Sequence, residues 1–260
     1  MNYDARKDAA ESYDAALKAI RLEKIRAGEI IPWKRRVEIG DCVLYEGDCL
    51  EVMQALPKVD AVVTDPPYGV LSQTGSAATR RSGGNSDKGI CMWDVSLTDA
   101  AVSQIISFAP MAMIWGGCHM ALPATFGYLV WDKVCEGLNF GEIEYCWTTE
   151  KFAPRMFRYK AAGMDGGKQH PTQKPVALMK WCLGFLPDAK TILDPFMGSG
   201  TTLVACAKMG RSGIGIELAP DYFDIACERV RKAYEQPDMF VEQSKEPNMV
   251  QTAMFDEVAK

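Results

Sequence analysis

The 260-residue sequence contains few of the residues that bind metals. It has only two histidines, His119 and His170, and its nine cysteines include no C-x-x-C pair. Zinc sites and disulfide frameworks depend on closely or regularly spaced Cys and His, so we expect neither, and we expect no metal. Scattered cysteines of odd number favour a reducing cytoplasm.

Long apolar runs are also absent. No stretch approaches the roughly 20 apolar residues of a membrane-spanning helix. The N-terminus, MNYDARKDAAESYDAA, is too charged for a signal peptide. A hydrophobic content of 48% and a charged content of 24% are those of a globular protein. We therefore expect a cytoplasmic location.

The net charge of −5 is unevenly distributed along the chain. Residues 235–260 hold six acidic and two basic side chains, a net charge of −4, which leaves about −1 for the rest. Residues 151–180 hold seven basic side chains against Asp165 alone, a local excess of +6. Such an excess suits either a DNA-facing surface or an ordinary solvated face.

Helix and strand patterns alternate along most of the chain. Residues 5–27 predict an amphipathic helix, because Tyr13, Leu17 and Ile20 recur at helical spacing among charged residues. Residues 37–48 predict a hairpin that turns at Gly40-Asp41, and 48–57 a short helix that ends at Pro57. Further strands are expected near 60–67, 111–117, 127–132 and 142–150, with helices near 97–108 and 175–186, and strand-helix pairs over 190–210 and 211–230. This alternation predicts a doubly wound, mostly parallel α/β sheet.

The segment AVVTDPPYG, residues 61–69, ends an apolar strand with a carboxylate and two prolines. Pro66 and Pro67 fix two φ angles and remove two backbone donors, so the segment can continue neither a sheet nor a helix. One interpretation is a rigid turn that closes a core strand. The other is a functional turn that holds Asp65, the Pro66 carbonyl and Tyr68 at the carboxyl edge of the sheet, where open α/β sheets bind ligands.

The segment DPFMGSGTT, residues 194–202, places a glycine loop between a strand and a helix. Gly198 and Gly200 allow a ligand to approach the backbone closely. Neither G-x-G-x-x-G nor G-K-[ST] is present, so neither NAD nor a nucleoside triphosphate is favoured. Glu217 ends the next strand, about 20 residues later, where a carboxylate accepts ribose hydroxyls. The pattern indicates an adenosine-bearing ligand without a pyrophosphate, and S-adenosylmethionine fits.

Three motifs in one order resemble a known family. DPPY at 65–68, HPTQKP at 170–175 and DPFMGSGT at 194–201 are similar to the amino-group DNA methyltransferases, which modify adenine N6 or cytosine N4. DPPY before the glycine loop resembles their permuted β group, over about residues 41–232. The resemblance implies a Rossmann-like, circularly permuted fold that uses S-adenosylmethionine. The chain departs from larger relatives in the short interval before HPTQKP, where they place a target-recognition region.

The resemblance also implies an organisation into segments. Residues 1–36 would form a helical extension and 37–234 the catalytic domain. Within that domain, 69–92 would be a mobile loop and 151–170 a small target-recognition insert. Residues 235–260 would form an acidic, flexible tail.

The resemblance carries roles over to individual residues. Asp65, Pro66, Pro67 and Tyr68 would be catalytic: Asp65 and the Pro66 carbonyl would accept the two N–H bonds of the target amine, and Tyr68 would stack on a base flipped out of the duplex. The cofactor would be held by Asp48, His170, Thr172, Lys174, Asp194, Phe196, Gly198, Ser199, Gly200, Thr201 and Glu217. Six basic residues are candidates for DNA binding: Arg80, Arg81, Arg155, Arg158, Lys160 and Lys168.

The expected function is therefore site-specific methylation of adenine N6 in double-stranded DNA (EC 2.1.1.72), because Asp leads the PPY motif whereas cytosine-N4 members more often carry Ser. Cytosine-N4 methylation, protein-glutamine methylation and a catalytically idle DNA-binding module are the alternatives. The tail repeats a Q-x-x-M-F spacing at Gln236–Phe240 and Gln251–Phe255. This spacing is similar to peptides that dock on the bacterial replicative sliding clamp, a second expected partner, although chance recurrence explains it as well.

Overall fold

The computed structural model describes residues 3–67, 96–135, 141–160 and 173–236, with side chains from residue 13 onward. Among these residues, no helix combines the length and the apolar character needed to cross a membrane. The predicted loop 69–92 and nearly all of the predicted tail lie outside the described residues.

One nine-stranded sheet runs through the described part of the chain, in the order β1-β2-β9-β8-β3-β4-β6-β5-β7. Parallel pairing joins β2 to β9, β9 to β8, β8 to β3, β3 to β4 and β5 to β7. Antiparallel pairing joins β1 to β2 and places β6 between β4 and β5. The strands are β1 (Trp33–Ile39), β2 (Cys42–Gly47), β3 (Ala61–Thr64), β4 (Met111–Trp115), β5 (Tyr128–Asp132), β6 (Ile143–Thr148), β7 (Arg155–Arg158), β8 (Thr191–Asp194) and β9 (Ser212–Glu217).

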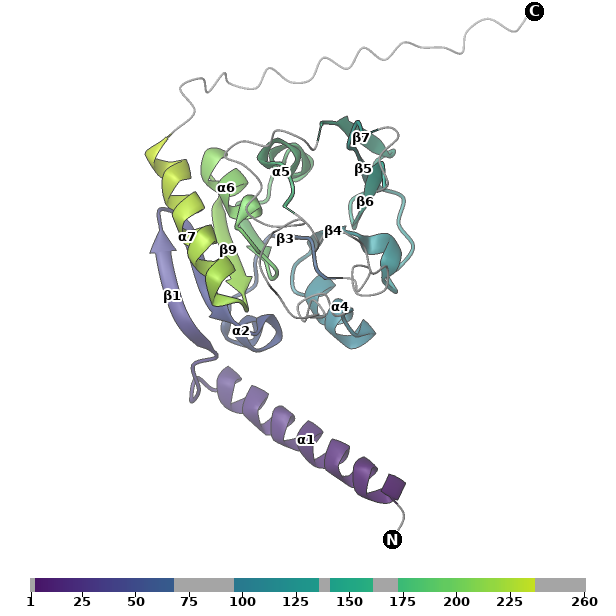
Figure 1. Cartoon of the computed structure of the whole chain (residues 1–260), viewed down its shortest axis with the longest axis vertical. Coiled ribbons are helices and arrows are strands. Elements are labelled where there is room, and N and C mark those ends of the chain that lie inside the picture. Colours follow the sequence, from purple (N-terminus) through teal and green to yellow (C-terminus); the bar gives the residue numbers. More distant parts are fainter. Residues whose placement is uncertain (1–2, 68–95, 136–140, 161–172, 237–260) are drawn as a thin grey trace, which may run out of the picture.

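Helices cover both faces of this sheet (Figure 1). Helices α5 (Val176–Leu183), α6 (Thr201–Lys208) and α7 (Pro220–Glu235) pack on one face, and α2 (Cys49–Ala55) and α4 (Asp99–Ile106) on the other. A short 3-10 turn, η2 (Gly117–His119), follows β4. The fold class is confirmed: a mostly parallel, doubly wound α/β sheet.

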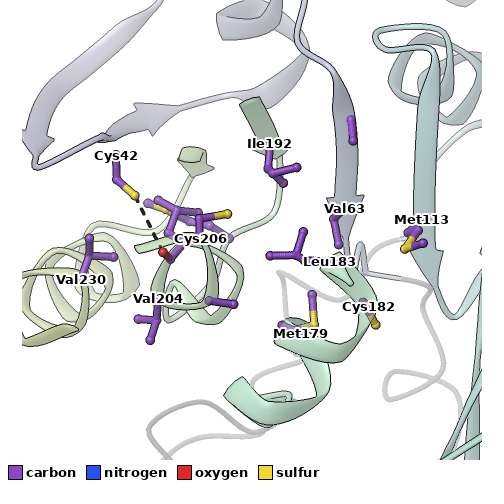
Figure 2. Close-up of a cluster of buried hydrophobic side chains, with 14 of the residues drawn as sticks. Cys42, Val63, Met113, Met179, Cys182, Leu183, Ile192, Val204, Cys206 and Val230 are labelled. Atoms are coloured by element: carbon purple, nitrogen blue, oxygen red, sulfur yellow. Dashed lines mark hydrogen bonds between the residues drawn. The ribbon is translucent and has the colours of Figure 1, made fainter. Parts of the chain in front are cut away.

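The central strands are buried on both sides, which explains why they read as continuous apolar runs. In β3, Val63 packs with α5 while Val62 packs with α2 and α4, and both are fully buried. Figure 2 shows the buried cluster that contains Val63. In it, Val63 and Ile192 of the sheet lie near Met179, Cys182 and Leu183 of α5. The two layers fix where the carboxyl end of each strand lies.

The hairpin predicted at Gly40-Asp41 is confirmed by β1 and β2, and the short helix by α2. Two details differ from expectation. The sheet begins at Trp33, inside the predicted helical extension. The stretch after residue 150, predicted to be a small target-recognition insert, contains β7, because these residues gain a parallel partner in β5 that no local pattern reveals.

Helix α1 (Tyr3–Arg26) confirms the first predicted helix and extends away from the sheet (Figure 1). Its predicted apolar stripe is not buried: Tyr13, Leu17 and Ile20 are exposed, and Ile25 near the end of the helix is buried instead. Two side-chain contacts tie α1 to α2, a bidentate pair between Arg21 and Glu51 and a hydrogen bond from Arg26 to Gln54. Periodicity therefore predicted the helix correctly but not its packing.

Candidate active site

Four neighbouring strands bring the sequence motifs to one edge of the sheet. Strands β2, β9, β8 and β3 are parallel and adjacent, so their carboxyl ends lie side by side. Asp48 follows β2, Glu217 ends β9, Asp194 ends β8 and Asp65 follows β3. The chain runs from β8 to β9 in one direction and from β3 to β4 in the other, which makes the junction of β8 and β3 a topological switch point. Open α/β sheets bind ligands at such points.

Asp65 directly follows β3 and is held from one side. Its Oδ2 lies 2.5 Å from Lys174 Nζ. Its Oδ1 is buried and, among the described residues, accepts no hydrogen bond. Burial raises the pKa of Asp65, and the nearby ammonium of Lys174 opposes that rise. A buried carboxylate oxygen without a donor is costly unless a ligand supplies one, so Oδ1 is a natural acceptor for a substrate N–H.

Lys174 was predicted to be one of the residues that hold the cofactor. In the structure this buried ammonium contacts two carboxylates of the chain itself, Asp65 at 2.5 Å and Glu144 at 2.8 Å. Glu144 lies on β6 and also pairs with Lys133, at 2.7 Å. Sequence reasoning missed Glu144, because a glutamate inside a strand usually faces solvent. The available signal was its alternation with Cys146 and Thr148, which are both buried on the same face.

Asp194 ties the strand before Asp65 to the glycine loop. Its Oδ1 accepts from Thr64 Oγ1 at 2.7 Å and from the backbone N–H of Phe196 at 3.1 Å. Its Oδ2 accepts from Thr202 Oγ1 at 2.6 Å. Burial raises the pKa of Asp194 to about 6, and these hydrogen bonds limit the rise. Three donors therefore already engage Asp194, which links β3, β8 and α6 where the switch point lies.

The glycine loop closes against two other elements. Gly198 and Gly200 have φ of +49° and +78°, a region that favours glycine. A Cβ on Gly200 would lie 3.0 Å from Ala226 Cβ in α7, so the absent side chain serves helix packing. Glycine was expected at position 200 so that a ligand can approach the backbone. The structure gives another reason for it: a Cβ at this position would face α7.

Glu217 faces the same loop from the end of β9. Its Oε2 accepts from Gly198 N at 3.0 Å and its Oε1 from Ala219 N at 2.8 Å. Burial raises the pKa of Glu217, while these backbone donors oppose the rise. Each oxygen keeps a second lone pair for an additional donor. The neighbouring carboxylate, Asp48, is exposed and caps α2 by accepting from Leu50 N at 2.8 Å.

Arg229 of α7 is a contact that sequence reasoning missed. Its Nη1 donates to the Ser199 carbonyl at 2.5 Å, to Ser199 Oγ at 2.7 Å and to Thr201 Oγ1 at 3.1 Å. Ser199 Oγ also donates to Gln173 Oε1, at 3.4 Å. Burial lowers the pKa of Arg229 to about 10. The guanidinium therefore fixes the loop and the start of α6 from behind, and an arginine inside an amphipathic helix carried no signal of this role.

Comparison with known proteins supports the same conclusion as this geometry. A family model described as DNA methylase matches residues 127–228. The type II methyltransferase M.HinfI of Haemophilus influenzae is 24% identical, with 75% of this chain and 70% of that protein covered. The putative methylase YubD of Escherichia coli K12 is 29% identical, with 74% and 92% covered. The family model and these relatives support an amino-group DNA methyltransferase family for this chain.

A solved structure supports the fold of this methyltransferase. The PvuII DNA methyltransferase, described as cytosine-N4-specific, superposes with a TM-score of 0.52 and 15% identity, covering 78% of this chain and 95% of that one. At this identity the likeness concerns the fold alone.

The DNA-binding candidates of this methyltransferase are only partly described. Arg155 and Arg158 are exposed on the edge strand β7, and strand alternation directs them to opposite faces. Arg158 pairs with Asp132 at 2.8 Å, and Lys160 is exposed just beyond the strand. Several predicted residues lie outside the described part of the chain: Tyr68, Arg80, Arg81, Lys168, His170, Thr172 and, apart from Gln236, both sliding-clamp motifs. Their roles stay predictions.

Proposed function

We propose that this chain transfers the methyl group of S-adenosylmethionine to the N6 amino group of adenine in double-stranded DNA. The observation that carries the proposal is the carboxylate of Asp65, which lies at the switch point beside the glycine loop with one buried oxygen that lacks a donor among the described residues.

The residues at this edge fit S-adenosylmethionine. Glu217 offers a carboxylate for ribose hydroxyls, and Gly198 with Gly200 shapes a loop at the start of α6. The loop, Phe196–Gly200, contains no lysine or arginine of the kind that binds a pyrophosphate. Asp48 would contact the adenine end, and the Phe196–Gly200 loop with Thr201 the methionine end. When bound, S-adenosylmethionine supplies an electrophilic methyl group on a sulfonium.

Asp65 and the Pro66 carbonyl would act on the nucleophile. The lone pair of an exocyclic amine is delocalised into its ring, so the amine attacks poorly. Two fixed acceptors on its two N–H bonds draw the nitrogen toward a tetrahedral geometry and stabilise the positive charge that develops during transfer. The Pro66-Pro67 pair keeps these acceptors in place before the substrate arrives, which limits reorganisation during the reaction. After transfer, Asp65 Oδ1 would accept the proton that the nitrogen releases.

The preference for adenine rests on Asp65 itself, together with the family resemblance of the DPPY motif. The target base would leave the duplex to reach this edge, because its amino group is otherwise paired within the stack. Tyr68 would stack on the flipped base. The exposed basic residues at β7 would contact phosphates.

The base can be identified directly. The protein is expressed in bacteria that lack their own DNA methylation, and the digested DNA is analysed by nucleoside mass spectrometry. The proposal expects N6-methyldeoxyadenosine that is absent from cells expressing Asp65→Ala. Detection of N4-methyldeoxycytidine would replace the adenine assignment with the cytosine one. The absence of any modified nucleoside would favour an idle DNA-binding module.

A further inference from the structure

Four side chains of alternating charge connect β5 and β6 to the Asp65 site. Lys133, just after β5, pairs with Glu144 Oε1 at 2.7 Å. Glu144 Oε2 lies 2.8 Å from Lys174 Nζ, which in turn lies 2.5 Å from Asp65 Oδ2. The four side chains come from three strand ends and the segment before α5, and their formal charges cancel. We call these four residues the charge relay.

The relay is largely withdrawn from water. The Lys174 side chain is 5% exposed, and those of Asp65 and Glu144 are 18% and 24% exposed. Burial alone would raise the pKa of Glu144, yet Lys174 and Lys133 lower it to about 2. Glu144 is therefore ionised at neutral pH. It competes with Asp65 for the same ammonium.

Other ionisable groups also lie near Asp65 and bear on its charge. Asp194 lies at the end of β8, and the Cys146 thiol lies on β6. Cys182, on α5, lies near Lys174. Burial raises the pKa of both thiols above their usual range, so they remain neutral. Among the described residues, Lys174 is therefore the cation in direct contact with Asp65, and Glu144 is the anion that moderates it.

We propose that Lys174 and Glu144 are positioning residues that set the basicity of Asp65. Lys174 occupies Oδ2 and favours the ionised form of Asp65, so that Oδ1 alone faces the target amine. Glu144 shares the ammonium and prevents it from weakening Asp65 as an acceptor. This inference deepens the proposed function and rests on it, and it gives Lys174 a role at the catalytic carboxylate instead of at the cofactor.

The relay predicts opposite effects from its two members. Lys174→Met leaves Asp65 buried without its cation and should raise the pH at which Asp65 titrates by about one to three pH units. Glu144→Gln removes the competing anion and should lower that pH. The double variant restores the balance of charge between Lys133 and Asp65, so its Asp65 should titrate between the two single variants.

The direct test is a carboxyl ¹³C NMR titration of the protein without cofactor or DNA. The Asp65 signal is assigned by its loss in Asp65→Asn. Glu142→Gln is the matched control, because it removes the same charge two residues away, at an exposed position. An Asp65 titration that is the same in wild type, Lys174→Met and Glu144→Gln would overturn the proposal.

Methyl-transfer kinetics provide the second readout. With Lys174→Met, the rate should fall at neutral pH and recover as the pH rises, because the acid limb of the profile moves upward. With Glu144→Gln, the maximal rate should fall while the limb moves downward, and cofactor affinity should stay within about twofold of wild type in both. Lost cofactor affinity in Lys174→Met with an unmoved limb would instead make Lys174 a cofactor ligand.

The two proposals fail in different ways. If the wild-type protein methylates no DNA, the proposed function is refuted, and the NMR titration still shows whether Lys174 and Glu144 control Asp65. If the protein methylates DNA but neither variant moves the Asp65 titration, the function stands and the relay is refuted.

Discussion

The buried carboxyl group of Asp194 should make the protein less stable as the pH rises. Its pKa is raised from 3.8 to about 6, chiefly by burial. The folded state therefore holds this proton more tightly than the unfolded state does. Its stabilising contribution is fully present below 3.8 and is lost as the pH rises through 6. At about 1.4 kcal/mol per pH unit, the loss amounts to about 3 kcal/mol.

The assay is urea unfolding of the wild type and of Asp194→Asn across this range of pH. Asparagine has nearly the same shape and does not titrate, so the wild-type free energy of unfolding minus that of the variant isolates the Asp194 proton. This difference should fall by about 3 kcal/mol from about pH 4 to about pH 7. Asp188→Asn, at an exposed aspartate before β8, is the matched control for the loss of a carboxylate. A difference for Asp194→Asn that stays flat, or that grows with pH, would refute the reasoning.

Three further predictions concern the loop and the basic surface. Gly200→Ala should lower the free energy of unfolding more than Gly210→Ala, because both glycines have positive φ but only a Cβ at 200 meets α7. Urea unfolding of the two variants measures the difference, and equal losses would mean that the contact with α7 costs nothing. Arg229→Met should cost about 1–3 kcal/mol, because it leaves the buried Ser199 carbonyl without a donor; unfolding at wild-type urea concentrations would contradict that role. Neutralising four residues should flatten the salt dependence of DNA binding by about three to four units of slope, and an unchanged slope would leave them as a solvated face. The four are Arg155, Arg158, Lys160 and Lys168.

The edge of the sheet was predictable because its signals are local. Each motif stands at the end of an apolar run, and the carboxyl ends of parallel strands meet at one edge whatever the order of the strands. The position of Asp65 beside the glycine loop follows from this rule. A hydrogen bond from Thr64, which precedes Asp65, to Asp194, which precedes the loop, joins the two strand ends.

The unpredicted features depend on contacts between distant segments. Lys174 belongs to a motif whose resemblance suggested the cofactor. Only the packing of α5 on the sheet and the pairing of β6 with β4 bring it to Asp65 and Glu144. Strand β7 forms because it pairs with the edge of β5. The basic sequence of β7 does not predict this pairing. Arg229 reads as a polar position of α7 until α6 is placed beside it.

The most direct test of the central claim is the single-turnover rate of methyl transfer to DNA by wild type and by Asp65→Ala, with cofactor affinity measured by calorimetry. If Asp65 accepts an N–H of the adenine amine, the rate should fall on the order of 10² or more. Cofactor affinity should stay within about twofold, because Asp65 acts on the nucleophile. Methylation by Asp65→Ala at close to the wild-type rate would contradict the account.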